Sequence, residues 1–305
     1  MNLADLKAYV ALAETGSINR AALRLRLTQP AVTRRIQNFE TSIRGTVLLD
    51  RRVKPPVLTP AGRQVLAHCQ GVLKAVAELE ACAAGGAEPA GELRIGISPG
   101  LAEAVLSTPL DDLRRRFPGL RLRVASEWTT SLIRKVGNYE LDCAVALVTD
   151  HHTLPVTVSG SLICSEILAV VAPRNFKPSV RNTRMLRIRD LEPYAWILNP
   201  AGCGYREALL RAYDRSNTSC RVVADILGYD LQLSLIARGA GLGLVPRRLI
   251  DRSSLRTELR ILRVLDFKPE VRVMMLRGTL LGNLGIVVDR LQRLLSTGSN
   301  RKILA

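Results

Sequence analysis

The 305-residue sequence has little of what a metal centre, an exported protein or a membrane protein requires. It contains three histidines (His68, His151 and His152), and its six cysteines form no CxxC pair, so a structural zinc site is not expected. No run of about 18 apolar residues occurs, which excludes a membrane-spanning helix. The first residues, MNLADLKAYVALAE, contain acidic side chains and no long apolar stretch, so we expect no signal peptide.

Acidic residues are also scarce. The chain has 27 Asp and Glu against 44 Lys and Arg, a formal net charge of +17 and a pI near 10.4. This surplus favours a polyanionic partner, although charge alone does not distinguish nucleic acid from a membrane surface. The charge is densest in residues 1–58, which hold ten basic and four acidic side chains, and residues 59–305 are basic as well.

The apolar content of 47% indicates a folded protein, and the length is sufficient for two domains. Without an export signal we expect reduced thiols and a cytoplasmic location. A redox-sensing cysteine is an alternative, although buried cysteine usually acts as a small hydrophobic side chain. The six cysteines are Cys69, Cys82, Cys143, Cys164, Cys203 and Cys220.

Two short helices are predicted at the N-terminus. Residues 3–15 repeat apolar side chains at spacings of three and four, and Gly16 ends this helix. Ser17 is placed to cap the second helix, in which Ala21 and Leu25 point inward.

A third helix begins near Thr28. Its hydroxyl is placed to accept a hydrogen bond from an orphan backbone N–H, and Pro30 lies in the first turn, where its missing N–H costs nothing. Val32, Ile36 and Phe39 share one face at spacings of four and three. Other side chains point elsewhere, among them Ala31, Thr33, Arg34, Arg35 and Gln37. This helix is suited to contact a polar, anionic surface.

A basic hairpin follows the three helices. Residues 47–58 hold two short β-type runs that flank a proline-containing turn. In this turn Arg51, Arg52 and Lys54 are placed to reach phosphates beside a groove. Three short helices, the last two joined by a tight turn, match the helix-turn-helix plan, in which the later helix enters the major groove. The hairpin is then the wing of a winged helix-turn-helix.

Residues 16–62 resemble the N-terminal domain of LysR-type transcriptional regulators. Many fixed spacings carry this resemblance: Gly16-Ser17, Ala21-Ala22, Leu25, Thr28-Gln29-Pro30-Ala31-Val32-Thr33-Arg34, Ile36, Phe39-Glu40, Leu48-Leu49-Asp50-Arg51 and Leu58-Thr59-Pro60-Ala61-Gly62. One departure is the stretch over residues 42–46, which is one residue longer than the Leu-Gly step usual in the family. The turn geometry is therefore the one local feature that the resemblance does not predict.

The resemblance implies roles for individual positions. Gln29, Pro30, Thr33 and Arg34 lie where this family reads the groove and its edges, and Arg51 lies at the wing. The full set that we predict to contact DNA is Ser17, Thr28, Gln29, Pro30, Ala31, Thr33, Arg34, Arg35, Arg51, Arg52 and Lys54. Without this context, a solvated helix face is the simpler interpretation of the arginines on the third helix.

Residues 59–86 are predicted to form a long helix, with Thr59 as N-cap and Pro60 in its first turn. Five apolar side chains follow at alternating spacings of four and three: Val65, Cys69, Val72, Val76 and Leu79. This heptad pattern predicts a two-stranded coiled coil, and the linker helix of the resembled family is a dimerisation helix. The alternative is an amphipathic helix packed on its own domain. Residues 87–91, rich in Gly and Pro, are predicted to be a hinge.

From residue 92 the pattern changes to alternating strands and helices, which favours open, mainly parallel sheets. Strands are predicted over 93–97, 120–125, 141–147, 163–172, 194–198, 221–224, 242–245, 259–265 and 271–276. Helices are predicted over 101–117, 131–138, 205–216, 230–238 and 284–295.

The predicted fold class is α+β overall. It consists of an N-terminal winged helix-turn-helix over residues 1–58, the long dimerisation helix, and a C-terminal effector-binding domain over 92–305. The resemblance implies that this last domain has two α/β subdomains like those of periplasmic binding proteins. Subdomain I covers 92–172 and 267–305, and subdomain II covers 173–266. Two crossover strands join them, near Ala172-Pro173 and Asp266-Phe267.

Ligands of open α/β sheets bind beyond the carboxyl ends of the strands, where helix N-termini offer free N–H groups to anions. The effector cleft of the resembled family lies between the two subdomains. The predicted effector site is Ser98, Pro99, Gly100, Thr129, Thr130, Thr149, Asn199 and Cys203. The alternative for each hydroxyl is that it only caps its own helix. The basic surplus and the helix ends favour a small organic anion.

Motifs for catalysis have no independent support. The glycines from Gly239 to Gly243 follow a helix and precede a strand, the reverse of the order in a dinucleotide fingerprint. His151-His152 has no acidic ligand spacing beside it, and no catalytic triad stands out. We therefore expect no enzyme activity, no cofactor and no metal. Two alternatives stay open: an enzyme with a DNA-binding appendage, which needs two titratable groups of shifted pKa in a cleft, and a ligand-independent architectural DNA binder.

The function predicted from the sequence is that of a ligand-responsive transcriptional regulator. The expected partners are a double-stranded DNA operator, a small-molecule effector, further copies of the chain in a dimer and a dimer of dimers (a homotetramer), and RNA polymerase. Ligand binding is expected to close the two subdomains and to change the spacing of the DNA-binding pairs. Such coupling requires that the ligand bind the two states with different affinities.

Overall fold

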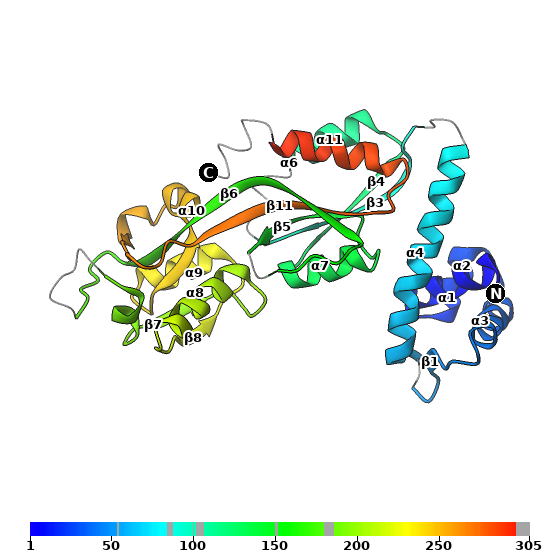
Figure 1. Cartoon of the computed structure of the whole chain (residues 1–305), viewed down its shortest axis with the longest axis horizontal. Coiled ribbons are helices and arrows are strands. Elements are labelled where there is room, and N and C mark those ends of the chain that lie inside the picture. Colours follow the sequence, from blue (N-terminus) through cyan, green and yellow to red (C-terminus); the bar gives the residue numbers. More distant parts are fainter. Residues whose placement is uncertain are drawn as a thin grey trace. The chain divides into compact units, whose positions relative to one another are not determined.

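The computed structural model describes residues 1–53, 55–83, 88–99, 101, 107–149, 152–179 and 186–296. These residues form two compact units (Figure 1). The first unit contains Met1–Glu88 with the segments Gly137–Glu140 and Thr279–Gly285, and the second contains the remainder of the chain. In the part of the chain that the structure describes, no helix is long and apolar enough to cross a membrane.

Three helices build the N-terminal core, as predicted. They are α1 (Leu3–Thr15), α2 (Ile18–Leu25) and α3 (Gln29–Ser42). Gly16 ends α1 in the left-handed conformation with a φ of 63°. The Thr28 hydroxyl caps α3 by accepting a hydrogen bond from the Ala31 N–H at 3.4 Å. The apolar face of α3 is buried at Val32, Ile36 and Phe39.

The predicted wing and long helix follow. They are β1 (Leu49–Asp50), β2 (Val57–Leu58), which pairs antiparallel with β1, and α4 (Pro60–Ala83). The Thr59 hydroxyl accepts from the Gly62 N–H at 2.9 Å, which confirms Thr59 as N-cap. A side chain at Gly62 would place its Cβ 2.3 Å from the Leu48 carbonyl oxygen. The buried Tyr9 hydroxyl donates to the Gly62 carbonyl at 2.8 Å, so the start of α4 is fixed against α1 and the wing.

The extra residue after α3 is absorbed in a tight turn. Arg44 and Gly45 are both left-handed, with φ values of 61° and 67°. The Gly45 N–H donates to the Glu40 carbonyl at 3.0 Å, and the Thr46 N–H donates to the Ile43 carbonyl at 3.4 Å. The insertion is therefore accommodated locally, and β1 still reaches its partner strand.

One large sheet runs through the second unit in the order β10-β6-β11-β5-β3-β4, with β9 also paired to β6. Its strands are β3 (Gly91–Ile97), β4 (Leu120–Ser126), β5 (Cys143–Val148), β6 (Val158–Pro173), β9 (Gly243–Pro246), β10 (Leu259–Leu262) and β11 (Glu270–Gly278). Strand β3 is parallel to β4 and β5, as predicted. Strands β6 and β11 are antiparallel to all their partners, so the prediction of mainly parallel sheets is wrong for them. The reason is that β6 carries the chain out of one half of the sheet and β11 carries it back.

The long strand β6 exchanges partners along its length. It pairs with β11 as far as Ile167 and with β9 from Leu168 onward. This crossing lies earlier in the chain than the predicted position near Ala172-Pro173. The second predicted crossover position, Asp266-Phe267, lies shortly before β11.

The remaining elements pack around this sheet. They are α6 (Ser107–Arg116), α7 (Thr129–Gly137), η1 (Ile188–Leu191), β7 (Ala195–Leu198), α8 (Gly204–Arg215), β8 (Arg221–Asp225), α9 (Tyr229–Ala237), α10 (Arg247–Arg252), η2 (Arg256–Glu258) and α11 (Leu284–Ser296). Of the helix predicted over 101–117, residues 102–106 lie outside the described residues. Helix α10 and the two 3-10 turns are missing from the prediction because they are too short to show helical periodicity.

A buried ion pair holds helices to β6 beside the partner exchange. Glu166 is 1% exposed and pairs with Arg248 of α10, and the Tyr205 hydroxyl of α8 donates to its other carboxylate oxygen at 2.5 Å. Burial raises the pKa of Glu166, against the opposing effects of the guanidinium and the hydroxyl. Removing one partner of such a pair leaves an uncompensated buried charge, so this cluster fixes α8 and α10 to the crossover strand.

Candidate functional site

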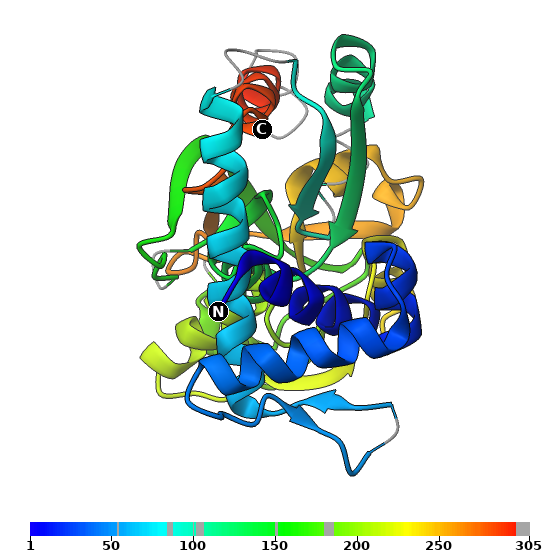
Figure 2. The ribbon, with the colours of Figure 1, turned by 90° about the vertical axis from the view of Figure 1, so that its right-hand side faces the viewer.

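The outer face of α3 presents the side chains predicted to read DNA. Figure 2 shows α3 with the β1–β2 hairpin extending beyond it. Gln29, Pro30 and Arg34 are exposed, and Arg35 is half-buried. Within the described residues Arg34 has no ion-pair partner. An exposed guanidinium without an internal partner is available for phosphate oxygens or base edges.

The hydroxyls near α3 are partly used by the fold. The Thr33 hydroxyl donates to the Gln29 carbonyl at 3.0 Å, and the Thr28 hydroxyl is the helix cap. Ser17 occupies the N-cap position of α2 but makes no capping hydrogen bond with its side chain. The prediction that Ser17 caps α2 is therefore wrong for its hydroxyl. Its carbonyl instead accepts from the Thr15 hydroxyl at 3.1 Å.

The wing is attached to α3 through Glu40. One Glu40 oxygen lies 2.5 Å from Arg51 Nη2, and the other accepts from the Leu48 N–H at 3.1 Å. Glu40 is 8% exposed, whereas the Arg51 side chain is 51% exposed. Glu40 belongs to the pattern that carries the family resemblance, but the sequence predicts no role for it. The structure indicates that it positions Arg51 and the start of the hairpin.

A second carboxylate holds Arg52. Its Nε and Nη2 donate to the two oxygens of Asp50 at 3.0 and 2.8 Å. The guanidinium lowers the pKa of Asp50 to about 2, so this pair is fully charged near neutral pH. The Arg52 side chain is 90% exposed. Lys54, the third predicted wing contact, lies outside the described residues.

The heptad residues of α4 divide between two faces. Val65 and Cys69 pack into the core formed by α1, α3 and the wing, next to Leu6, Tyr9 and Phe39. This is the alternative arrangement, an amphipathic helix on its own domain. Cys69 is 4% exposed, so its side chain is not available to a seam between two chains, whereas Val65 is half-buried.

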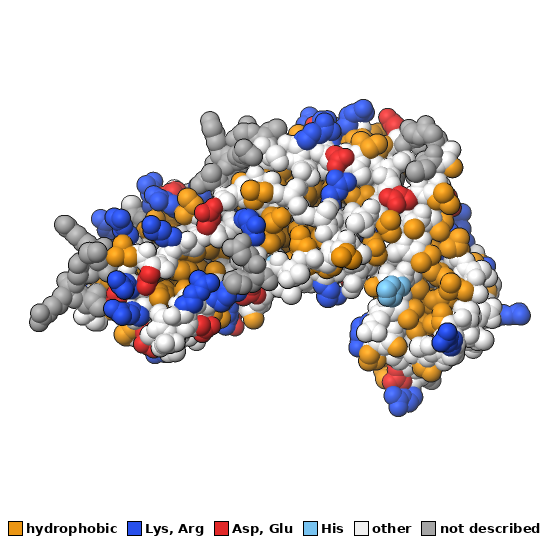
Figure 3. All heavy atoms as spheres, viewed as in Figure 1, with side chains coloured by type: hydrophobic (Ala, Val, Ile, Leu, Met, Phe, Trp, Pro, Cys, Tyr) orange, Lys and Arg blue, Asp and Glu red, His pale blue; other side chains and the backbone are white. Residues whose placement is uncertain are grey.

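A different stripe of α4 faces solvent. Val72 and Leu79 are 44% and 70% exposed, and His68 and Ala75 are exposed as well. Their spacing of four, three and four is that of a heptad seam. Figure 3 shows hydrophobic side chains gathered along this helix. Val76, the remaining predicted seam residue, is half-buried.

Three of the predicted effector residues meet at the end of β5. The Ser98 and Thr129 hydroxyl oxygens lie 3.4 Å apart. Ser98 accepts from the Leu147 N–H at 3.2 Å, and Thr129 donates to the Leu147 carbonyl at 2.9 Å. Both hydroxyls are buried and join α7 and β3 to β5. The third residue, Thr149, is 8% exposed, and its hydroxyl lies 2.9 Å from His152 Nδ1.

A small cavity of about 280 Å³ lies beside this cluster. It is lined by Thr130, Ile133, His152, Thr153 and Glu207. His152 Nε2 lies 3.9 Å from a Glu207 carboxylate oxygen. Of the predicted effector residues Thr130 is exposed here, Pro99 is half-buried, and Gly100 lies outside the described residues.

The N-terminus of α8 approaches the same region. Cys203 is the N-cap residue of α8 and is 1% exposed. A Cβ on Gly204 would lie 3.2 Å from the Leu147 carbonyl oxygen, and one on Gly202 would lie 3.5 Å from the Trp128 Cβ. Asn199 is buried and donates from its amide to the Ile226 carbonyl at 3.1 Å. The structure therefore brings together predicted residues that lie far apart in the sequence.

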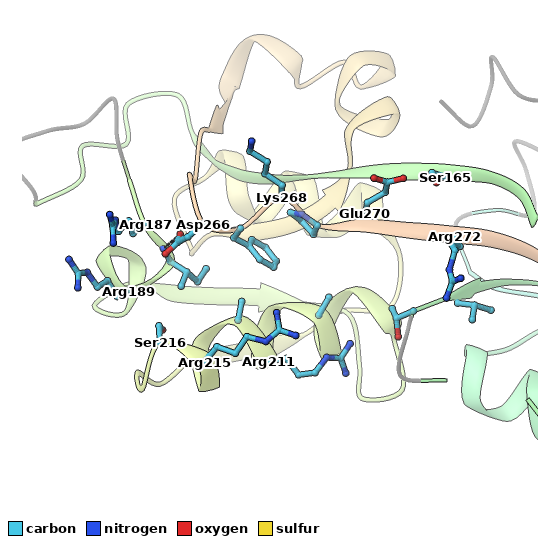
Figure 4. A pocket seen from close by; sticks show the side chains of 17 residues that line it. Ser165, Arg187, Arg189, Arg211, Arg215, Ser216, Asp266, Lys268, Glu270 and Arg272 are labelled. Carbon is cyan, nitrogen blue, oxygen red and sulfur yellow. Dashed lines mark hydrogen bonds between the residues drawn. The ribbon is translucent and has the colours of Figure 1, made fainter. Parts of the chain in front are cut away.

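A larger cavity, of about 800 Å³, is absent from the sequence prediction. It lies between α8, η1 and residues 266–272, and it shares with the predicted effector set only Thr149. Five of the residues that line it are arginines (Figure 4). No contiguous motif marks these residues, because they come from segments that are distant in the chain.

The described residues hold no metal cluster, and burial makes three of their thiols unreactive. No group of three or more His, Cys, Asp or Glu side chains is placed there to hold a metal ion. The thiols that form no disulfide in the described part of the chain are those of Cys69, Cys143, Cys164, Cys203 and Cys220. Burial raises the pKa of the Cys69, Cys203 and Cys220 thiols to about 11. These groups stay protonated near neutral pH and are poor nucleophiles.

Comparison with known families gives two matches that together span most of the chain. Residues 3–63 match the model of the "bacterial regulatory helix-turn-helix protein, lysR family". Residues 86–279 match the model of the "LysR substrate binding domain".

Curated relatives support the same grouping. A "probable hydrogen peroxide-inducible genes activator" of Mycobacterium xenopi is 36% identical over 159 residues, which cover 52% of this chain and 80% of the relative. The "uncharacterized HTH-type transcriptional regulator YusT" of Bacillus subtilis is 26% identical over 261 residues, 86% of this chain and 84% of the relative.

Solved structures of similar fold extend over the whole chain. A full-length OxyR variant from Pseudomonas aeruginosa has a TM-score of 0.78 at 19% identity and covers 99% of both chains. Full-length CbnR in complex with its target DNA has a TM-score of 0.56 at 19% identity, over 96% of this chain and 100% of that one. At these identities the likeness concerns the fold.

Proposed function

We propose that this chain, which belongs to the LysR family of transcriptional regulators, binds a two-fold symmetric operator. We also propose that a small organic anion controls this binding. The family consists of regulators and not of enzymes. The sequence prediction of a DNA-binding regulator with an effector-binding domain is thereby confirmed. Three finer points belong to the proposal: the residues that bind DNA, the way in which copies pair, and the chemistry of the effector.

The observation that carries the DNA-binding proposal is the free, exposed side of α3. Gln29 and Arg34 project from the first turns of a helix whose opposite face is buried. In helix-turn-helix proteins the N-terminal residues of the recognition helix contact base edges. A bidentate guanidinium contact to guanine is worth about 1–3 kcal/mol of discrimination. We therefore assign base reading to Arg34 and Gln29, and phosphate contacts to Arg35.

The wing contributes phosphate contacts in this proposal. Arg51 and Arg52 keep exposed guanidinium groups while Glu40 and Asp50 fix their positions. Each guanidinium has donors left over, since a carboxylate uses at most two of five. Contacts of this kind fix the register on the duplex and carry little sequence information.

The exposed stripe of α4 is the proposed dimerisation seam. It consists of His68, Val72, Ala75 and Leu79 in place of Val65 and Cys69, which pack against the core of the unit. A two-fold pairing of this stripe gives a protein that reads two half-sites. The dimer of dimers, contact with RNA polymerase and a cytoplasmic location belong to the same proposal by analogy with the family.

The effector site that we propose is the cluster around the end of β5. Ser98, Thr129 and Thr149 meet there with the N-terminus of α8. The helix N-termini of α7 and α8 favour an anionic ligand. Because the Ser98 and Thr129 hydroxyls already bond Leu147, we assign ligand contact mainly to Thr130, Thr149 and backbone N–H groups.

Hydrogen peroxide is the alternative effector that the relatives' names raise. A thiol sensor needs a low pKa and access to solvent. Cys203 occupies a helix N-cap, which favours a thiolate, but it is 1% exposed and burial raises its pKa to about 11. Cys203 is therefore not suited to react as a thiolate, and we propose a bound ligand as the effector.

Gel-shift titration of the full chain on a DNA fragment selected from its own genome tests the DNA-binding proposal. Arg34→Ala is expected to abolish specific binding with an unchanged circular dichroism spectrum. Arg52→Ala is expected to give a milder loss that is uniform across sequences and reduces the salt slope by about one. Arg252→Ala, which removes an exposed charge from the second unit, is the control and should bind normally. Undiminished specific binding by Arg34→Ala contradicts the assignment.

Calorimetry with a panel of organic acids tests the effector proposal separately. Saturable binding of a mono- or dicarboxylate that Thr130→Val weakens is the expected result. Tight binding restricted to neutral or cationic compounds contradicts the anion assignment and leaves the DNA-binding assignment intact.

A further inference from the structure

The larger cavity of the second unit is a separate place to bind a small molecule. Its volume of about 800 Å³ lies in the range of roughly 300–1,000 Å³ typical of ligand sites. In Figure 4, Arg211 and Arg215 extend from α8, Arg187 and Arg189 lie at the start of η1, and Lys268, Glu270 and Arg272 lie along the segment opposite α8. Of the predicted effector residues it shares only Thr149.

Charge is strongly one-sided in this cavity. The basic side chains that line it are Arg187, Arg189, Arg211, Arg215, Lys268 and Arg272, and the acidic ones are Asp266 and Glu270. Asp266 also serves the fold, because its Oδ1 accepts from the Ile188 N–H at 2.9 Å. A concave surface with this excess of positive charge concentrates anions more effectively than the same charges on a convex surface.

Most of these cations have no internal counter-charge. Arg187, Arg189, Arg215 and Lys268 form no ion pair within the described part of the chain. Arg211 lies 3.9 Å from Glu207, one turn earlier on α8, which is a long contact. Elsewhere in this chain arginines commonly stand against carboxylates, as the pairs at Glu166 and Asp112 illustrate. The unpaired cations in the cavity therefore repel one another, and a bound anion would relieve this repulsion.

The sequence of α8 explains the shape of the cavity. Its core face carries Tyr205, Leu209 and Tyr213, which are buried. Its cavity face carries Ala208, Arg211, Ala212 and Arg215, at spacings that place them side by side. The two alanines leave the space that the two arginines flank. On the other side Phe267, 9% exposed, supplies an apolar wall.

A purely structural explanation accounts for only one of these arginines. Arg215 lies in the last turn of α8, where a cation interacts favourably with the helix dipole. This effect does not explain Arg187, Arg189 or Lys268, which come from other segments and line the same space. Cations from three segments of the chain line one cavity, which distinguishes it from the generally basic surface of the chain.

We propose that this cavity binds a compact polyanion, a small molecule with at least two carboxylate or phosphate groups and a short apolar body. Arg211 and Arg215 bind one anionic group through paired N–H donors. Arg187, Arg189 and Lys268 line the same cavity and attract the second anionic group by their charge, and the alanines and Phe267 contact the body. The site adjoins the effector cluster around β5, with which it shares Thr149, but the side chains that bind the anion are different ones.

Calorimetric titration of the full chain with citrate and with pyrophosphate, at constant ionic strength, tests this proposal. We expect saturable binding that the double variant R211Q/R215Q weakens by roughly tenfold or more, since two charge-assisted contacts are lost. Arg252→Gln removes an exposed charge outside the cavity and should leave the affinity unchanged. Stronger binding of citrate identifies a polycarboxylate site, and stronger binding of pyrophosphate identifies a site for phosphorylated compounds; either supports the proposal.

Two outcomes would overturn it. Absence of saturable heat with both anions, in a chain that still binds its operator, removes the cavity site and leaves the proposed function standing. Affinity that survives R211Q/R215Q but falls in Thr130→Val assigns the anion to the effector cluster instead. Lys268→Gln, on a different element, should weaken binding independently and replaces the double variant if circular dichroism shows that α8 is disturbed.

Discussion

Glu40 is the residue through which the structure predicts that the wing is held to the recognition helix. Its carboxylate accepts from the Leu48 N–H at 3.1 Å and pairs with Arg51 at 2.5 Å. In Glu40→Gln the amide oxygen still accepts from Leu48, so the loss is that of the charge. Hydrogen bonds to charged groups contribute about 1.5–3 kcal/mol, and exposed ion pairs about 0–1 kcal/mol. With the Arg51 side chain 51% exposed, we expect a loss of about 1 kcal/mol.

Hydrogen exchange of the peptide that contains Leu48 measures this loss locally. An opening free energy lower by about 1 kcal/mol corresponds to exchange roughly fivefold faster, confined to the hairpin and the end of α3. Glu14→Gln is the matched control, because Glu14 pairs with Arg24 at 2.5 Å away from the wing. Specific DNA affinity should fall in Glu40→Gln relative to Glu14→Gln, although both variants lose one negative charge. Unchanged exchange at Leu48 in Glu40→Gln refutes the reasoning.

Three further predictions concern packing, thiol chemistry and assembly. Gly62→Ala should destabilise the first unit by about 1–3 kcal/mol, seen as faster exchange in α4, because the new Cβ meets the Leu48 carbonyl oxygen; normal exchange would argue against that contact. Cys203 should react slowly with iodoacetamide at pH 8, since its pKa is raised to about 11. Native stability should fall as the pH rises from about 9 to 11, because the unfolded thiol ionises first while the native thiol keeps its proton; fast labelling at pH 8 contradicts the burial argument. Leu79→Arg should raise the dimer dissociation constant in analytical ultracentrifugation, whereas Glu80→Arg, off the stripe, should not; equal effects would exclude the seam.

Features with local causes can be predicted from the sequence. The caps at Thr28 and Thr59 depend on a hydroxyl three residues before a backbone N–H that needs a partner. The buried face of α3 follows from helical spacing alone. The wing is predictable because β-type runs flank a turn. Each of these signals lies within a few residues of the structure that it specifies.

Features that depend on tertiary packing cannot be predicted from such local signals. The heptad pattern of α4 shows that one face is apolar, but not that Val65 and Cys69 are covered by α1 and α3. The direction of β6 and β11 depends on the route of the chain between the two halves, which strand periodicity does not report. The sequence singles out the Ser98 and Thr129 hydroxyls, yet their bonds to Leu147 follow only from the sheet geometry.

The cationic cavity shows the same limit. In the sequence its arginines are a few among many, because basic residues are spread along the whole chain. Arg211 and Arg215 show a helical spacing with Ala208 and Ala212, which is the one available signal. Their meeting with η1 and Lys268 depends on tertiary structure.

Selection of bound sequences from a pool of randomised DNA duplexes tests the central claim most directly. The full-length chain is expected to enrich an inverted repeat with half-sites about one helical turn apart or a multiple of this. Arg34→Ala is expected to enrich no motif, while Arg252→Ala enriches the same repeat as the unmodified chain. Failure of the unmodified chain to enrich any motif, or recovery of the same repeat by Arg34→Ala, would contradict the assignment of α3 as the DNA-reading helix.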